Sequence, residues 1–209
     1  MSSAMNDRLT VFIVDDDASV RDSIALLLSL RGYRTAVFAR AEDFLGALQP
    51  PWAGCLLTDI RMPGMSGLEL QVELARRGIA LPIVVISAHG DVASARAAFK
   101  GHAIDFLPKP YDDEQLCAAI DIAFARTRRR LAAADAQQEY AARFAELSVR
   151  EREITTLLVR GLNNREIGEH LGISPRTVES HKARLMQKLG AANLAELMRM
   201  VESRGAPTR

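Results

Sequence analysis

The sequence lacks a long apolar segment. No uninterrupted apolar run in its 209 residues approaches the about 18 that a membrane-spanning helix needs. The first residues, 1–8, are polar, whereas a secretory signal would be apolar. We therefore expect a protein that does not contact the membrane and that stays in the cytoplasm.

Cysteine is scarce as well. The only two, Cys55 and Cys117, lie in separate apolar segments and lack the clustered spacing of a metal site or a redox pair. We predict that both are reduced residues of the core. Apolar residues make up 48% of the chain and charged residues 25%, which is typical of an ordinary globular protein and not of a disordered or fibrous one.

The net charge of +1 hides an asymmetry between the two halves of the chain. Residues 1–125 carry 11 basic and 16 acidic residues, a net charge of −5, while residues 126–209 carry 16 basic and 10 acidic residues, a net charge of +6. The length suits two domains, since domains commonly run about 100 to 150 residues. An acidic first half suits metal or phosphoryl chemistry, and a basic second half suits nucleic acid.

Short apolar runs alternate with longer amphipathic segments in the first half. Several of the runs are apolar on both faces, as strands of a parallel sheet covered by helices must be. We predict an α/β domain over residues 8–125 with a doubly wound, five-stranded parallel sheet of the flavodoxin-like kind. The predicted strands are 10–14, 35–37, 55–58, 83–87 and 104–107, and the predicted helices are 20–30, 41–48, 67–76, 92–100 and one from 113 onward.

The second half reads as helical throughout. A pattern without Pro or Gly runs from about Asp113 to Ala145 and contains a predicted linker, 126–143, whose heptad-like spacing leaves self-association open. Four short capped helices follow, and a very tight turn joins 165–171 to 175–189. We predict a small all-α helix-turn-helix domain over residues 144–204.

Polar side chains follow four of the predicted strands. Asp15 and Asp16 follow the first strand, Asp59 the third, Ser87 the fourth and Lys109 the fifth. The carboxyl ends of parallel strands meet at one edge of a sheet, where ligands bind, so we expect these groups to lie together. Clustered carboxylates repel one another unless a hard dication such as Mg2+ neutralises them. The set predicts phosphoryl transfer with Asp59 as nucleophile and Lys109 stabilising the developing charge.

Four strings in this half resemble the signature of the response-regulator receiver family in order and spacing. They are Val-Asp-Asp at 14–16, the segment 59–67, Ser-Ala-His-Gly at 87–90, and Lys109-Pro110. The resemblance implies that Asp59 becomes an aspartyl phosphate. It also implies a Mg2+ site formed by Asp15, Asp16, Asp59 and the main-chain carbonyl of Arg61.

The same resemblance implies a switch beside the phosphorylated residue. Ser87 would bind the phosphoryl group, Phe106 would turn inward, and a cis peptide before Pro110 would aim Lys109 at the site. Two departures from the family pattern, Pro108 and the Gly-His-Ala run at 101–103, leave this chemistry untouched. An Asp after a strand is often only a helix N-cap, and we predict that role for Asp17.

Strings in the second half, at 147–153, 161–167 and 173–181, resemble the LuxR-type (NarL/FixJ) effector domain, and the whole layout resembles the FixJ branch. Independently, 175–189 is amphipathic, with Val178, Leu185 and Leu189 as the buried stripe. The opposite face is polar and basic and is sized for a DNA major groove, although a merely solvated face is the alternative. The predicted DNA contacts are Arg176, Thr177, Glu179, Ser180, His181, Lys182, Arg184 and Lys188.

These patterns together predict a two-component response regulator and not an enzyme. A sensor histidine kinase would phosphorylate Asp59, the receiver would dimerise, and paired effector domains would bind promoter double-stranded DNA and act with RNA polymerase. One alternative is a Mg2+-dependent phosphohydrolase that turns over at Asp59, but the residues after Asp59 offer no dedicated general acid. The other is a DNA-binding protein whose receiver is constitutively active.

Overall fold

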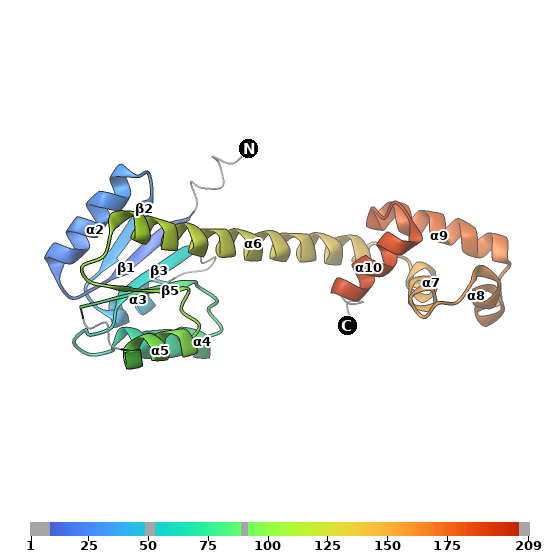
Figure 1. Cartoon of the computed structure of the whole chain (residues 1–209). Helices are drawn as coiled ribbons and strands as arrows, with labels where there is room; N and C mark the ends of the chain where they lie inside the picture. Colours follow the sequence, from blue (N-terminus) through green and yellow to red (C-terminus); the bar gives the residue numbers. More distant parts are fainter. Residues whose placement is uncertain (1–8, 49–52, 89–91, 205–209) are drawn as a thin grey trace. The chain divides into compact units, whose positions relative to one another are not determined.

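The computed structural model describes residues 9–48, 53–88 and 92–204, and the chain divides into two compact units, Met1–Arg130 and Leu131–Arg209 (Figure 1). This division falls inside the predicted linker, and the domain boundaries 8–125, 126–143 and 144–204 stay predictions. Residues 89 and 90 of the third receiver string, and residue 8, lie outside the described residues. No helix of the described residues has the length and apolar character needed to cross a membrane.

The first unit is a five-stranded parallel sheet covered by helices (Figure 1). Its elements are β1 (Thr10–Val14), α2 (Ala18–Leu30), β2 (Arg34–Phe38), α3 (Ala41–Ala47), β3 (Gly54–Asp59), α4 (Gly67–Arg76), β4 (Ile83–Ser87), α5 (Val92–Lys100), β5 (Asp105–Pro108) and the start of α6 (Asp113–Ala145). The strand order is β2-β1-β3-β4-β5, with every neighbouring pair parallel. This is the doubly wound arrangement, in which the chain first adds β2 on one side of β1 and then adds β3, β4 and β5 on the other side. The predicted fold class is confirmed.

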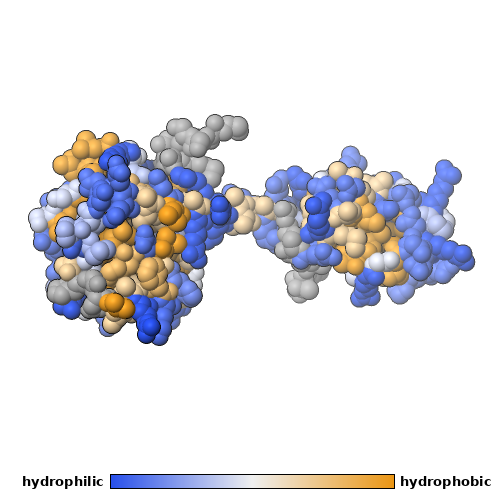
Figure 2. Space-filling model, in the orientation of Figure 1, coloured by the Kyte–Doolittle hydropathy of each residue, from blue (hydrophilic) through white to orange (hydrophobic). Residues whose placement is uncertain are grey.

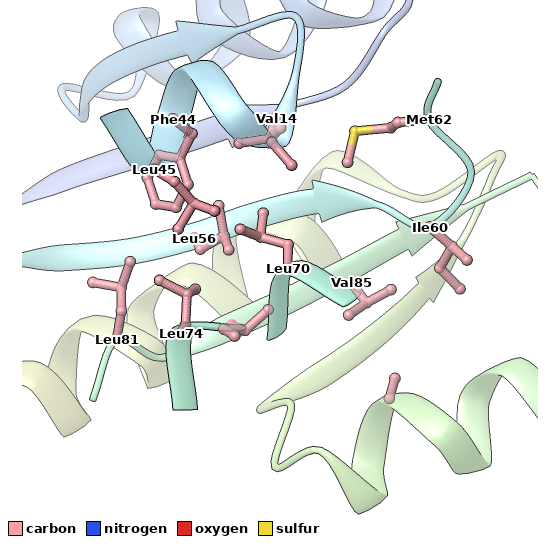
Figure 3. Close-up of a cluster of buried hydrophobic side chains, with 13 residues drawn as sticks. Val14, Phe44, Leu45, Leu56, Ile60, Met62, Leu70, Leu74, Leu81 and Val85 are labelled. Atoms are coloured by element: carbon pink, nitrogen blue, oxygen red, sulfur yellow. The ribbon is translucent and has the colours of Figure 1, made fainter. Parts of the chain in front are cut away.

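The core of this unit explains the apolar runs of the sequence. Every residue of β3 and β4 is buried, since helices cover both faces of the sheet. Val14, Phe44, Leu56, Leu70 and Val85 belong to one cluster of buried side chains (Figure 3). Each such fully buried side chain contributes about 1.5–3 kcal/mol. Both cysteines are free and buried, as predicted.

The loop between β3 and α4 is held tightly against the end of its strand. Gly67 donates its N–H to the carbonyl of Ile60 at 3.0 Å, and a Cβ at Gly67 would lie 2.0 Å from the carbonyl oxygen of Asp59. Only glycine allows this approach. The capping box of Ser66 and Glu69 then starts α4. The backbone around Asp59 is therefore fixed on both sides.

Helix α6 runs unbroken over the predicted residues, Asp113–Ala145. Its first turns belong to the first unit, where Leu116, Ile120 and Phe124 are buried. The Thr127 hydroxyl, fully buried, donates to the carbonyl of Gly54 at 2.7 Å. Its last turns supply two aromatic side chains, Tyr140 and Phe144, to the core of the second unit.

The second unit is all helical and is built around the end of α6. Its further elements are α7 (Val149–Val159), α8 (Asn164–Leu171), α9 (Pro175–Leu189) and α10 (Leu194–Arg204). Tyr140 and Phe144 of α6 pack with the predicted stripe of α9, Val178, Leu185 and Leu189. Ser148 and Glu151 form a capping box at the start of α7, and Ser174 accepts from the N–H of Thr177 at the start of α9.

The turn between α8 and α9 is tight for a visible reason. A Cβ at Gly168 would lie 2.7 Å from the carbonyl oxygen of Ile173, so the backbone of the turn lies closer to α8 than a side chain at this position would allow. Gly172 ends α8 in the left-handed conformation with φ of 66°. The geometry is that of a helix-turn-helix. The end of this unit where α8 and α9 lie is largely hydrophilic (Figure 2).

Candidate functional site

The structure brings three of the predicted groups into one ionic cluster at the carboxyl edge of the sheet. The Lys109 ammonium donates to Asp15 Oδ2 at 2.7 Å and to Asp59 Oδ1 at 2.9 Å. The two carboxylates are buried, with 1% and 6% of the residue exposed. One cation thus compensates two buried anions, which would otherwise be costly to bury.

Lys109 is aimed at this cluster by the turn that follows β5. Its peptide bond to Pro110 is cis, and its own N–H donates to the carbonyl of Ser87 at 2.7 Å. Burial alone would lower the pKa of the Lys109 ammonium, but its hydrogen bonds to Asp15 and Asp59 outweigh burial and raise the pKa above its ordinary value. The side chain is therefore a permanent cation at neutral pH.

The second oxygen of Asp59 is held by the backbone. The N–H of Arg61 donates to Asp59 Oδ2 at 2.6 Å, so both carboxylate oxygens are oriented. The loop beyond Arg61 is tied to α3, because the Met65 N–H donates to Glu42 Oε1 at 3.0 Å. Sequence reasoning missed this second contact, and no motif links Glu42 to the loop.

Asp15 is positioned by groups that the sequence also did not reveal. The Arg21 guanidinium donates to the carbonyl of Asp15 at 2.6 Å, and the N–H of Asp17 donates to Asp15 Oδ1 at 2.9 Å. Asp17 itself accepts from the N–H of Ser19 at 2.8 Å and is the N-cap of α2, as predicted. The cap therefore serves both the helix and the buried carboxylate before it.

The predicted metal ligands are brought together only in part. Asp15 and Asp59 share Lys109, whereas Asp16 is exposed, and no three His, Cys, Asp or Glu side chains within the described ranges stand together as a metal site. Magnesium commonly uses one or two carboxylates and completes its shell with water and other oxygens. The donor chemistry of this edge therefore fits Mg2+ without a third converging side chain.

The two predicted switch residues lie on neighbouring strands beside the cluster. Ser87 is the last residue of β4 and is 1% exposed. Phe106, on β5, is half-buried and packs against the core described above. In the pairing of β4 with β5, Phe106 lies opposite Val85, which is two residues before Ser87. Ser87 and Phe106 are therefore close to each other on two hydrogen-bonded strands.

Helix α9 presents most of the predicted DNA-contacting residues on its open face. Arg176, Thr177, Glu179, Ser180 and Arg184 are exposed. Two of the other predicted DNA contacts, His181 and Lys182, are half-buried. The last, Lys188, is exposed, but its ammonium forms an ion pair with Glu151.

Lys188 is tied to the core of its own unit. Its ammonium donates to Glu151 Oε2 at 2.8 Å and to the carbonyl of Glu146 at 3.2 Å. Glu151 is 3% exposed, and it also accepts from the N–H of Ser148 in the capping box of α7. Its burial raises the pKa, yet hydrogen bonds from Lys188 and Ser148 hold the pKa of Glu151 below its usual range. This pair locks α9 to α7.

We expect Glu151→Ala to destabilise the second unit by about 2 kcal/mol, through loss of a helix cap and of one partner in a mostly buried ion pair. Because the folded-state pKa of Glu151 is lowered, the stabilisation is present above its unfolded-state pKa and is lost as pH falls through the folded-state value. Hydrogen-exchange mass spectrometry of α7–α10 at neutral and acid pH measures both effects. Glu153→Ala, which removes an exposed pair with Arg150, is the control and should change little. Equal effects of both substitutions would contradict the assignment.

A phosphoacceptor-like acidic edge on a doubly wound sheet, joined to a helix-turn-helix unit, defines the class of the response regulators. Residues 11–121 match the family model of the response regulator receiver domain, and residues 145–201 match that of bacterial regulatory proteins of the luxR family. The chain therefore belongs to the response regulators with a LuxR-type DNA-binding domain, and it is similar to FixJ-like transcriptional regulators.

Individual relatives agree with this over nearly the whole chain. The transcriptional regulatory protein FixJ of Azorhizobium caulinodans is 45% identical, with 94% of this chain and 93% of that protein covered. The regulatory protein TdiR of Thauera aromatica is 42% identical over 92% of this chain and 85% of its own. Among solved structures, the response regulator StyR is 42% identical, with a TM-score of 0.81 and coverage of 93% of this chain and 98% of that one.

Proposed function

We propose that Asp59 is the phosphoacceptor through which a sensor histidine kinase controls this response regulator. The observation that carries the proposal is the shared Lys109 ammonium between Asp15 and Asp59 at the carboxyl edge of the sheet. An Asp59 oxygen would form the new bond to phosphorus while the bond from phosphorus to the donor breaks. Lys109 is then in position to compensate charge on the transferred oxygens.

A bound Mg2+ would supply the remaining positive charge for the transfer. The residues that would hold it are Asp15, Asp16, Asp59 and the main-chain carbonyl of Arg61, all hard oxygen donors. Asp15 and Asp59 are supported as ligands by their positions, because both are buried and share the Lys109 ammonium at the edge of the sheet. Asp16, exposed and next in the chain, is available to bind through water.

Phosphorylation would be read by the neighbouring strands. Ser87 would donate its hydroxyl to the phosphoryl oxygens, and Phe106 would turn into the space that this movement opens. The surface formed by α5 and β5 would change as a result, and it already carries exposed apolar side chains, Val92 at 83% and Phe99 at 50% exposed. We propose that two phosphorylated copies associate through this surface.

A dimer would present two recognition helices to two half-sites of a promoter. Because the partner proposed is chromosomal DNA, the proposed place of action is the cytoplasm, and the proposed output is altered transcription by RNA polymerase. Lys188 is a weaker candidate than the others because Glu151 engages it. The DNA contacts that we propose are Arg176, Thr177, Glu179, Ser180, His181, Lys182, Arg184 and, in second place, Lys188.

The test uses the full chain treated with acetyl phosphate and Mg2+. Intact-mass and peptide mass spectrometry should find one added phosphoryl group on Asp59, and chelation of Mg2+ should prevent it. Fluorescence anisotropy should then show tighter binding to selected duplex DNA after treatment than before. Phosphorylation elsewhere, or DNA binding that ignores treatment, would overturn the proposal, and the second result would favour a constitutively active receiver. Steady phosphate release from simple phosphomonoesters would instead favour the phosphohydrolase.

A further inference from the structure

A single carboxylate lies on the exposed face of α9, the helix proposed to read DNA. Glu179 is in the second turn of the helix, and its side chain is 59% exposed. A carboxylate facing DNA is repelled by phosphates and can contribute little to affinity. Its presence on a basic face calls for another role, and reading a base is the role that a carboxylate can perform.

The carboxylate is held by two neighbours at one of its oxygens. Asn164, the first residue of α8, donates its side-chain amide to Glu179 Oε2, and the Lys182 ammonium lies 3.7 Å from the same oxygen. In the part of the chain that the structure describes, both contacts fall on Oε2, which leaves Oε1 to accept from a partner outside the protein. Two helices therefore fix the direction of one acceptor.

The chemistry of the major groove selects the partner of such an acceptor. A carboxylate has no proton to donate, so the acceptor edges of guanine and thymine repel it. Adenine offers one donor next to the acceptor N7, whereas cytosine offers the N4 amino group without an acceptor beside it. An oriented carboxylate therefore favours cytosine over the other three bases.

We propose that Glu179 reads a cytosine in each half-site and that Asn164 is a positioning residue for this contact. The inference rests on the proposed function, since α9 must enter the major groove for Glu179 to reach a base. Lys182 offsets part of the carboxylate's repulsion by the phosphates. Asn164 acts only on the orientation of the Glu179 carboxylate. Without the Asn164 amide, Glu179 keeps its charge but loses its fixed orientation.

The test is selection of binding sites from randomised duplex DNA by the full chain treated with acetyl phosphate and Mg2+. The wild-type protein should enrich one cytosine per half-site and should bind that site about tenfold more tightly than the same site with thymine. Glu179→Gln should enrich adenine at this position, because an amide pairs with both N6 and N7 of adenine. Glu169→Gln, which removes an exposed carboxylate of α8, should enrich the same sites as the wild type.

Asn164→Ala separates positioning from folding. We expect the preference for cytosine over thymine to fall several-fold while affinity for the thymine site stays unchanged. A purely structural role would instead weaken both sites equally and leave their ratio intact, and that result would overturn the role of Asn164.

The remaining outcomes distinguish failure of the proposed role of Glu179 from failure of the proposed DNA-binding function. If the wild-type protein enriches no sequence, DNA recognition by this unit fails and the inference fails with it. If the wild type enriches a site but Glu179→Gln enriches the same bases, only the inference is overturned. The same holds if Glu179→Gln merely binds every sequence more tightly, since Glu179 would then only repel phosphates.

Discussion

A chain carrying Asp59→Asn should gain no phosphoryl mass with acetyl phosphate and Mg2+, and it should bind DNA equally with and without the donor. The side-chain amide has nearly the shape of the carboxylate, but it lacks the anionic oxygen that would attack phosphorus. The amide can keep an acceptor oxygen toward Lys109, but its NH2 group then faces the N–H of Arg61, so one backbone hydrogen bond is lost while the rest of the site is kept. The whole donor-dependent gain in DNA affinity should disappear.

The Asp59→Asn protein should be about as stable as the wild type, so a loss of phosphorylation cannot be attributed to unfolding. Asp15 and Asp59 share one ammonium, and removing one of two like charges relieves repulsion. We expect the free energy of unfolding of the first unit to stay within about 1 kcal/mol of the wild type. Asp22→Asn, at an exposed position of α2, is the matched control and should still be phosphorylated at Asp59. Undiminished phosphorylation of the Asp59→Asn protein would show that another carboxylate is the acceptor.

Much of the fold follows from local sequence pattern. Parallel strands buried on both faces, such as β3 and β4, leave continuous apolar runs that few other structures produce. The candidate site was predictable for a related reason, because the topology of such a sheet brings the residues after its strands to one edge. Asp15, Asp59 and Lys109 meet there, although β4 separates β5 from β3, because the turn after β5 aims Lys109 back at the cluster.

The contacts that the sequence did not reveal are those between side chains far apart in the chain. A helical wheel assigns Lys188 to the polar face of α9, but its partner Glu151 is 37 residues away and belongs to α7. Arg21 and Glu42 likewise bind backbone groups that no spacing rule identifies. The linker pattern predicted the helix α6 but not its packing, since the burial of Tyr140 depends on a core made by other helices.

Lys109→Met should have two large effects with one cause. Phosphorylation of Asp59 should slow by about 100-fold, because removing one positioned positive donor commonly costs that much in rate. The first unit should also lose about 3 kcal/mol of stability at neutral pH, since two buried carboxylates are left without their shared cation. Timed mass spectrometry measures the first effect, and hydrogen exchange of β1 and β3 measures the second. Lys100→Met, at the exposed end of α5, is the control for both.

The pH dependence and a second substitution separate the two effects. The raised pKa of Lys109 keeps the wild-type cluster intact through neutral pH, and its contribution is lost only as pH rises through that raised value. In Lys109→Met, the carboxylates of Asp15 and Asp59 repel each other without their shared cation. Adding Asp15→Asn should restore most of the stability because it removes that repulsion, yet phosphorylation should remain slow because both the cation that faces Asp59 and a proposed Mg2+ ligand are then missing. Recovery of the rate together with the stability would mean that Lys109 acts on the fold alone.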